Sequence, residues 1–273
     1  MARAEGICFR MRTGRAARIA VFPYHDENET QRRSYVTLIL VAMNVGAWIF
    51  LQGAGAETPL ATSVCNLGLI PGELTLSVPP GASFQMTDRL VCLTDPGRQV
   101  SNVFTSMFLH GSWMHLLGNM WFLWLFGNNI EDSMTRPRFA IFYLLSGLGA
   151  ALLQVVVEPD STVPMVGASG AISGVMGAYL VLYPRVRVFT MVPLGFFLTS
   201  IALPAWAMLI YWMLLQLLGG FTRIGAEGEG GVAFWAHVGG FVAGAVLVKA
   251  FERSDRVLAH QRHHWRPERT GWQ

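Results

Sequence analysis

The sequence predicts an all-α membrane protein, folded as a compact polytopic bundle of six transmembrane helices. The first observation is composition: 52% of the 273 residues are hydrophobic and 14% are charged, whereas a soluble domain carries about 25% charged residues. The second is a set of six apolar runs that approach the roughly 20 residues needed to cross a bilayer. The runs are Tyr35–Leu51, His115–Asn129, Phe139–Val157, Ala168–Tyr183, Pro204–Gly220 and Val232–Phe251.

The placement of arginine predicts the orientation of these runs. Most of the 20 basic residues lie before the first run, after the second or fourth, or at and beyond the end of the sixth. Only Arg89, Arg98 and Arg223 fall on the other side. The positive-inside rule then puts both termini in the cytoplasm. This location accounts for the net charge of +3 without nucleic acid.

The start of the chain shows no cleavable signal peptide. Its short apolar stretch, Ala16–Pro23, is interrupted by arginine and is too short for the core of such a peptide. We therefore expect the first run to act as an uncleaved anchor. The six-span plan suits a multi-pass protein of a cell (inner) membrane.

Three parts are expected along the chain: a basic cytoplasmic N-terminal segment over residues 1–34, a membrane domain over 35–251 and a basic cytoplasmic tail over 252–273. The connection Val186–Leu203 is apolar but contains Pro193 and Gly195, and it is interpreted as an interfacial loop rather than a seventh span. The tail is interpreted as a solvated end near anionic lipid, with metal binding by its histidines as the alternative. The residues concerned are His263, His264 and Arg266.

A long outer loop over residues 52–109 separates the first two runs, and loops of this length are usually functional. Cys65 and Cys92 both lie in it. An oxidising compartment would allow them to form a disulfide, but two free thiols are an equal alternative because sequence fixes no geometry. Cys8 lies on the reducing side and is expected to be unpaired.

The fourth and sixth runs carry a serine and a histidine in settings that favour close helix packing. Ser169 is followed by small residues at helical spacing, and His237 lies three residues before Gly240 and seven before Gly244. Small residues four apart let two helix backbones approach each other. Packing of the two runs would bring the hydroxyl of Ser169 to the ring of His237, and a serine becomes a nucleophile when a base takes its proton. The alternative is a purely structural glycine contact in which the histidine bonds a carbonyl.

The second run adds His115 and Asn119, which are four residues apart and therefore share one helix face. Two polar side chains aimed at one point resemble the donors of an oxyanion hole. A polar helix contact and a metal site are the alternatives. His110 lies five residues before His115 and the chain contains no HExxH motif. We therefore expect no metal.

Together these motifs resemble those of the rhomboid intramembrane serine proteases. The matching residues are His110, His115 and Asn119, the sequence Gly167-Ala-Ser169-Gly170, and Ala236-His237-x-x-Gly240-x-x-x-Gly244. The resemblance implies a six-helix fold with a water-filled cavity open to the non-cytoplasmic side. It also implies that Ser169 is the nucleophile and His237 the general base, with His115, Asn119 and the backbone N–H of Ser169 in the oxyanion hole. Structural roles are implied for His110, Gly167, Gly170, Gly240, Gly244 and Glu131, with an ordinary helix-end charge as the alternative for Glu131.

Two positions depart from the family pattern. Ser101 and Asn102 stand where a Trp-Arg pair is typical of the outer loop. Ser173 stands where an aromatic ring stacks on the catalytic histidine in some members. Either another side chain supports His237, or packing alone holds the ring. No acidic residue stands out within the runs, so a Ser-His dyad is favoured over a triad.

The resemblance implies cleavage of single-span membrane proteins within the lipid bilayer, without cofactor, metal or nucleic acid. One alternative is a catalytically inactive rhomboid-like protein that binds and escorts membrane proteins, but it predicts loss of Ser169 or His237, and both are present. A small transporter is the other alternative. It predicts acidic residues within the spans or inverted repeats, and neither is evident.

Overall fold

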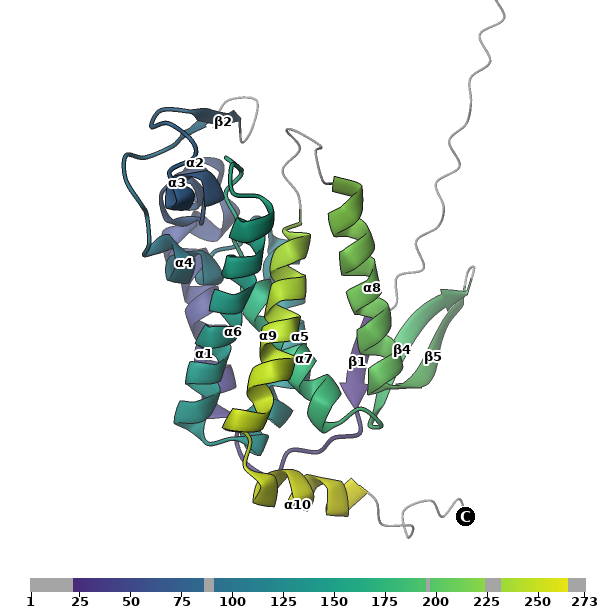
Figure 1. The fold of residues 1–273 in the computed structure, drawn as a ribbon. Coiled ribbons are helices and arrows are strands. Elements are labelled where there is room, and N and C mark those ends of the chain that lie inside the picture. The colour runs from purple at the N-terminus through teal and green to yellow at the C-terminus, as the bar shows by residue number, and fades with distance from the viewer. Residues whose placement is uncertain (1–21, 86–90, 195–196, 224–231, 265–273) are drawn as a thin grey trace, which may run out of the picture.

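The computed structural model describes residues 22–85, 91–194, 197–223 and 232–264. Within them, long helical segments occupy all six apolar runs predicted from the sequence (Figure 1). They are α1 (Tyr35–Gly46) with its continuation η1 (Ala47–Leu51), α5 (Trp113–Ser133), α6 (Arg136–Val157), α7 (Ser169–Leu182), α8 (Ala205–Arg223) and α9 (Phe234–Phe251).

Burial divides these helices into a central one and outer ones. The side chains of α7 are buried almost without interruption from Gly170 to Tyr179. The outer helices expose large apolar side chains, among them Phe50 at 84%, Leu152 at 64% and Val246 at 72%. In the described part of the chain, three helices are long and apolar enough to cross a membrane: α6, α8 and α9. The fold is therefore a mostly helical membrane protein with α7 at its centre.

Glycines allow α7 and α9 to pack backbone against backbone. A Cβ atom at Gly240 would overlap the carbonyl oxygen of Gly170, and one at Gly244 would overlap that of Gly174. The pairing of the fourth and sixth runs through small residues is thus confirmed.

The prediction that every element is helical was wrong, because a three-stranded antiparallel sheet of order β1-β4-β5 lies beside α8 (Figure 1). Its strands are β1 (Phe22–Asp26), β4 (Arg187–Leu194) and β5 (Phe197–Pro204). The connection Val186–Leu203 is therefore a hairpin and not a loop. Burial alternates along β4, where Val188 and Thr190 are buried and Arg187 is exposed, and a period of two is the strand pattern.

The sheet also changes the interpretation of the N-terminal segment. Phe22 pairs with Met191, and Asp26 pairs with Val188. The last part of residues 1–34 therefore joins the folded domain through β4, whereas residues 1–21, with Cys8, lie outside the described residues.

The outer loop between α1 and α5 folds into short elements at one end of the bundle (Figure 1). They are η2 (Gly53–Gly55), α2 (Glu57–Leu67), α3 (Pro71–Thr75), the hairpin β2 (Ser83–Gln85) and β3 (Val91–Leu93), α4 (Asn102–Thr105) and η3 (Ser106–Phe108). A disulfide joins Cys65 of α2 to Cys92 of β3. Of the two alternatives for these cysteines, the structure shows the paired one.

The helix α10 (Ser254–His264) lies across the opposite end of the bundle (Figure 1). Val257 packs into the hydrophobic core, and His260 is fully buried with its Nε2 2.9 Å from Oδ2 of Asp132. The first part of residues 252–273 is therefore folded against the bundle, because these side chains find partners on α5 and in the core. Of the residues expected to form a solvated end, the side chains of His263 and His264 lie outside what the structure describes. Arg266 lies outside the described residues.

Candidate active site

Ser169 is the first residue of α7, the innermost helix. Its backbone N–H is one of the first-turn donors for which a helix offers no acceptor, and the preceding Ala168 provides no side-chain cap. Gly167 has a φ of +130° and donates its N–H to the carbonyl of Ser106 at 2.9 Å. A conformation with positive φ favours glycine. The turn at Gly167 thus lets α7 begin at Ser169, so that the hydroxyl of Ser169 lies at the positive, N-terminal end of the helix dipole.

His237 lies in the first turn of α9, and its Nε2 is 2.8 Å from Oγ of Ser169. The approach of α7 and α9 described above sets this distance. The start of α9 is also held by Gln154, whose side-chain oxygen accepts the N–H of Ala236 at 3.1 Å. The structure thus brings together the two residues that the sequence motifs paired, in a geometry that allows proton transfer from the hydroxyl to the ring.

Gln216 of α8 contacts the other nitrogen of the same ring, with Oε1 2.7 Å from Nδ1 of His237. An amide oxygen only accepts, so Nδ1 carries the hydrogen and Nε2 is left free to accept from Ser169. The Trp212 ring lies 5.7 Å from the His237 ring, centroid to centroid. Ser173, at the position of the family's aromatic residue, instead donates to the carbonyl of Ser169 at 2.6 Å. Support for His237 therefore comes from another helix.

Sequence reasoning missed Gln216. A signal was present, because Gln216 is the only amide side chain within the apolar run Pro204–Gly220, and polar residues at membrane depth are functional candidates. Its partner lies 21 residues away on another helix, so the pairing itself needed the fold.

His115 and Asn119 approach the serine from α5. A Cβ atom built on Gly167 would lie 2.8 Å from Nε2 of His115 and 3.4 Å from Oγ of Ser169, so both side chains surround this glycine. The N–H of Gly111 points at Nδ1 of His115 at 3.4 Å, which favours the tautomer with hydrogen on Nε2. The Nδ2 of Asn119 is buried and makes no hydrogen bond with the described residues. His115 and Asn119 thus line the same cavity as Ser169, and each side chain carries a donor.

His110 supports this arrangement from behind. It is fully buried, and its ring meets that of His115 edge to face with centroids 5.2 Å apart. The side chain of Gln52 makes two hydrogen bonds with the backbone of His110: it accepts the N–H at 2.8 Å and donates to the carbonyl at 2.7 Å. Ser112 caps α5 by accepting the N–H of His115 at 3.1 Å. His110 is thus placed as a packing residue behind His115.

These side chains line a cavity of about 990 Å³. Its walls include the residues just described, Ser169, His237, His115, Asn119 and Gln216, together with Phe84 and Gln85 of the hairpin β2–β3. The cavity combines apolar walls with a few convergent polar groups, which is typical of ligand sites. Among the described residues, no group of three or more His, Cys, Asp or Glu side chains could hold a metal ion.

Glu131 lies at the other end of α5, away from this cavity. It accepts the N–H groups of Val36 and Thr37 at 2.9 and 2.7 Å, and the hydroxyl of Thr37 at 2.8 Å. Its contacts are those of a structural residue that holds the start of α1. Asn102, in place of the family's Trp-Arg pair, donates to the carbonyl of Gly68 at 3.0 Å and so helps to fold the outer loop.

Two features define the class of this protein. It is a mostly helical membrane protein, and a serine and a histidine meet where two of its helices pack together. A family model described as the Rhomboid domain matches residues 97–253. The match covers more than half of the chain and contains both residues, and the chain therefore belongs to the rhomboid family.

Curated relatives agree with this assignment. The chain is 37% identical to "RHOMBOID-like protein 6, mitochondrial" of Arabidopsis thaliana over 164 residues, which are 56% of this chain and 52% of that protein. It is 30% identical over 168 residues to "Rhomboid-like protease 5" of Toxoplasma gondii, covering 60% of this chain and 18% of that one. It is 40% identical over 76 residues to "Putative rhomboid protease YdcA" of Bacillus subtilis (strain 168), covering 28% and 38%. The chain thus spans about half or less of each relative's length.

Proposed function

We propose that this chain is an intramembrane serine endopeptidase that cleaves transmembrane segments of single-span membrane proteins through a Ser169–His237 dyad. The observation that carries the proposal is the 2.8 Å contact between Oγ of Ser169 and Nε2 of His237 on the wall of a large cavity. Family membership supports it, since the chain carries a Rhomboid domain and is similar to relatives named as proteases.

The reaction assigns one role to each side chain. His237 takes the hydroxyl proton of Ser169 as the oxygen attacks the substrate carbonyl, and it returns the proton to the leaving amine. The negative oxygen of the tetrahedral intermediate accepts hydrogen bonds from His115, Asn119 and the backbone N–H of Ser169. Water then hydrolyses the acyl-enzyme, with His237 acting again as base.

The substrate must expose its backbone to react. Carbonyl groups inside a transmembrane helix are bonded within the helix and are sterically covered. A target segment therefore has to unwind locally at the cavity, and we expect cleavage near small or helix-breaking residues. Before the attack, Gln216 keeps the neutral ring of His237 in the tautomer whose Nε2 can accept the proton.

We also propose that all six predicted runs cross a cell (inner) membrane, with both termini in the cytoplasm. The gathering of arginines around the end of the bundle that carries α10 supports this orientation. The active-site cavity lies toward the other end, where the outer loop folds, and would open to the non-cytoplasmic side.

Labelling with a fluorophosphonate tests the proposed chemistry. We expect the wild type to be labelled, and the signal to be lost in Ser169→Ala and in His237→Ala. Labelling that persists in Ser169→Ala would exclude this serine as the nucleophile. A wild type that binds membrane proteins but is never labelled would instead favour an inactive rhomboid-like escort protein.

A further inference from the structure

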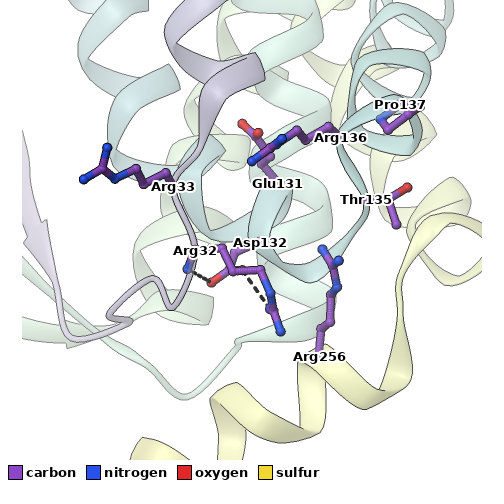
Figure 2. A pocket seen from close by; sticks show the side chains of 8 residues that line it. All are labelled: Arg32, Arg33, Glu131, Asp132, Thr135, Arg136, Pro137 and Arg256. Atoms are coloured by element: carbon purple, nitrogen blue, oxygen red, sulfur yellow. Dashed lines mark hydrogen bonds and ion pairs between the residues drawn. The ribbon is translucent and has the colours of Figure 1, made fainter.

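A second cavity, of about 260 Å³, lies at the α10 end of the bundle, opposite the outer loop. It is lined by arginines from three separate parts of the chain: Arg32 and Arg33 before α1, Arg136 at the start of α6 and Arg256 on α10 (Figure 2). Glu131, Asp132, Thr135 and Pro137 complete its wall. The side chain of Arg33 extends away from the other three arginines (Figure 2), and the guanidinium groups of Arg32, Arg136 and Arg256 favour an anionic ligand.

The two carboxylates in the wall are occupied by interior partners. Asp132 accepts the N–H of Gln31 at 2.6 Å, bonds Nε2 of His260 at 2.9 Å and pairs with the guanidinium of Arg32 at 3.1 Å. Glu131, as shown above, binds the first turn of α1. Both acids therefore hold the chain at the entry to α1, and only Arg32 among the four arginines has a carboxylate partner (Figure 2).

The other three arginines keep their charge available. In the described part of the chain, no salt bridge involves Arg33, Arg136 or Arg256. The guanidinium of Arg136 stacks on the ring of Tyr35 at 4.4 Å, and that of Arg256 donates to the carbonyl of Met134. Neither contact neutralises the positive charge of the arginine, so the wall of the cavity carries more positive than negative charge.

Backbone groups add to the same preference. Helix α6 begins at Arg136, and its N-cap Thr135 makes no capping hydrogen bond through its side chain. The first N–H groups of a helix have no acceptor within it, and they favour phosphate together with the helix dipole; in α6 the second residue, Pro137, has no N–H, so Arg136 supplies the first of these donors. The cavity thus meets the positive end of a long helix as well as the arginine side chains.

Apolar surface next to the cavity indicates what kind of anion would bind. Leu38 and Ile39 of α1 are 48% and 56% exposed, and Ile141 of α6 is 52% exposed. They lie five residues or so beyond Arg33 and Arg136, which is about 8 Å along a helix. A free phosphate would leave these side chains uncovered, whereas a phospholipid would place its headgroup in the cavity and its chains along them.

We propose that this cavity binds the phosphate group of an acidic phospholipid. The proposal does not depend on the protease activity. The volume suffices for a phosphate with several waters, since one water takes about 30 Å³ of liquid. Arginine forms paired hydrogen bonds with phosphate oxygens, and Arg136 and Arg256 supply guanidinium groups that have no carboxylate partner among the described residues.

Native mass spectrometry of the full chain tests the site. The protein is incubated in detergent with equal amounts of phosphatidylcholine and phosphatidylglycerol, and the lipid retained per protein is measured. We expect retention of phosphatidylglycerol. Each basic residue near an acidic lipid contributes about fivefold to binding, so the double variant Arg136→Gln, Arg256→Gln should lose about twentyfold.

The matched control is Arg253→Gln, which removes the same charge three residues from Arg256 but outside the cavity wall. It should retain the lipid within about twofold, less than one arginine contributes. Should the double variant fail to fold, Arg136→Gln alone still predicts a loss of about fivefold. Equal retention by wild type and the arginine variants would overturn the proposal. Displacement of the lipid by inorganic phosphate at equal concentration would also overturn it, because the site would then be one for free phosphate.

Discussion

Oε1 of Gln216 lies 2.7 Å from Nδ1 of His237, on the far side of the ring from Ser169. The position that an acid occupies in a Ser-His-Asp triad is thus held by an uncharged amide. An amide fixes the ring and its tautomer, but it does not stabilise the imidazolium as a carboxylate does. In the proposed mechanism, Ser169 and His237 therefore act as a dyad, and Gln216 orients the ring.

Replacing this amide should slow the reaction without preventing substrate binding. Gln216→Leu keeps the volume and removes the acceptor, which costs about one hydrogen bond in the transition state, or roughly tenfold in kcat. Gln216→Glu keeps an acceptor oxygen and should recover most of that loss. Steady-state cleavage of a reporter segment separates kcat from KM.

The control for this experiment is Leu214→Ala, since Leu214 lies on the same helix and is 52% exposed. It should leave kcat unchanged. A Gln216→Leu variant with wild-type kcat would show that the ring of His237 needs no partner at Nδ1.

The contact between α7 and α9 should be sensitive to a single methyl group. Gly244→Ala adds a Cβ that overlaps the carbonyl of Gly174, and overpacking of this kind costs about 1–3 kcal/mol. We expect a lower unfolding temperature and loss of fluorophosphonate labelling, because separation of the helices lengthens the Ser169–His237 contact. Gly46→Ala is the control, since a Cβ there meets no atom within 4 Å. A fully stable and reactive Gly244→Ala would contradict the packing described here.

The stability of the protein should depend on the protonation of Asp26 in β1. Burial raises the pKa of this carboxyl to about 7, although it accepts hydrogen bonds from Tyr179 at 2.5 Å and Asn129 at 2.9 Å. The folded state then keeps a proton that the unfolded chain loses near pH 4, so stability falls as pH rises from about 4 to about 7.

Asp26→Asn removes this dependence, because an amide does not titrate. Its stability relative to the wild type should therefore grow between pH 4 and pH 7, by up to about 4 kcal/mol at 1.4 kcal/mol for each unit of pKa. Thermal unfolding in one detergent across this range measures the difference. A difference that stays constant with pH would refute the raised pKa of Asp26.

The disulfide between Cys65 and Cys92 anchors the hairpin that contributes Phe84 and Gln85 to the active-site cavity. Cys92 is paired with Phe84 across the hairpin. Replacing both cysteines with serine should destabilise this region by about 2–4 kcal/mol and speed proteolysis of the outer loop. Each single replacement should match the double variant. Equal proteolysis rates with and without the bond would argue against the anchoring role.

The sequence predicted where the six helical segments lie and that Ser169 and His237 come into contact. Both predictions have a physical reason. Helix positions follow from local apolar runs, and the glycines near Ser169 and His237 indicate close packing of their helices. The sheet was harder to predict. Gly195 stands between two strand-length runs in Val186–Leu203, which is a hairpin signal, but the helical pattern elsewhere favoured a loop.

What the sequence could not supply are partnerships between distant segments. β1 pairs with a strand more than 150 residues away. The strand has five residues, and an alternating apolar pattern over so short a segment is too weak to predict it. His260 is an ordinary basic-tail residue until the fold places it against Asp132. The role of Gln216 and the arginine cavity could not be predicted either, because both depend on which distant residues the fold brings together.

The most direct measurement of the central claim is mass-spectrometric mapping of a reporter transmembrane segment after incubation with the reconstituted protein. We expect a defined cut within the segment by the wild type and a loss of at least about 10³-fold in Ser169→Ala. The control Ser200→Ala, on β5 and bonded to Tyr24 at 2.8 Å, should cut at the wild-type position and rate. An unchanged cut in Ser169→Ala would show that Ser169 is not the nucleophile.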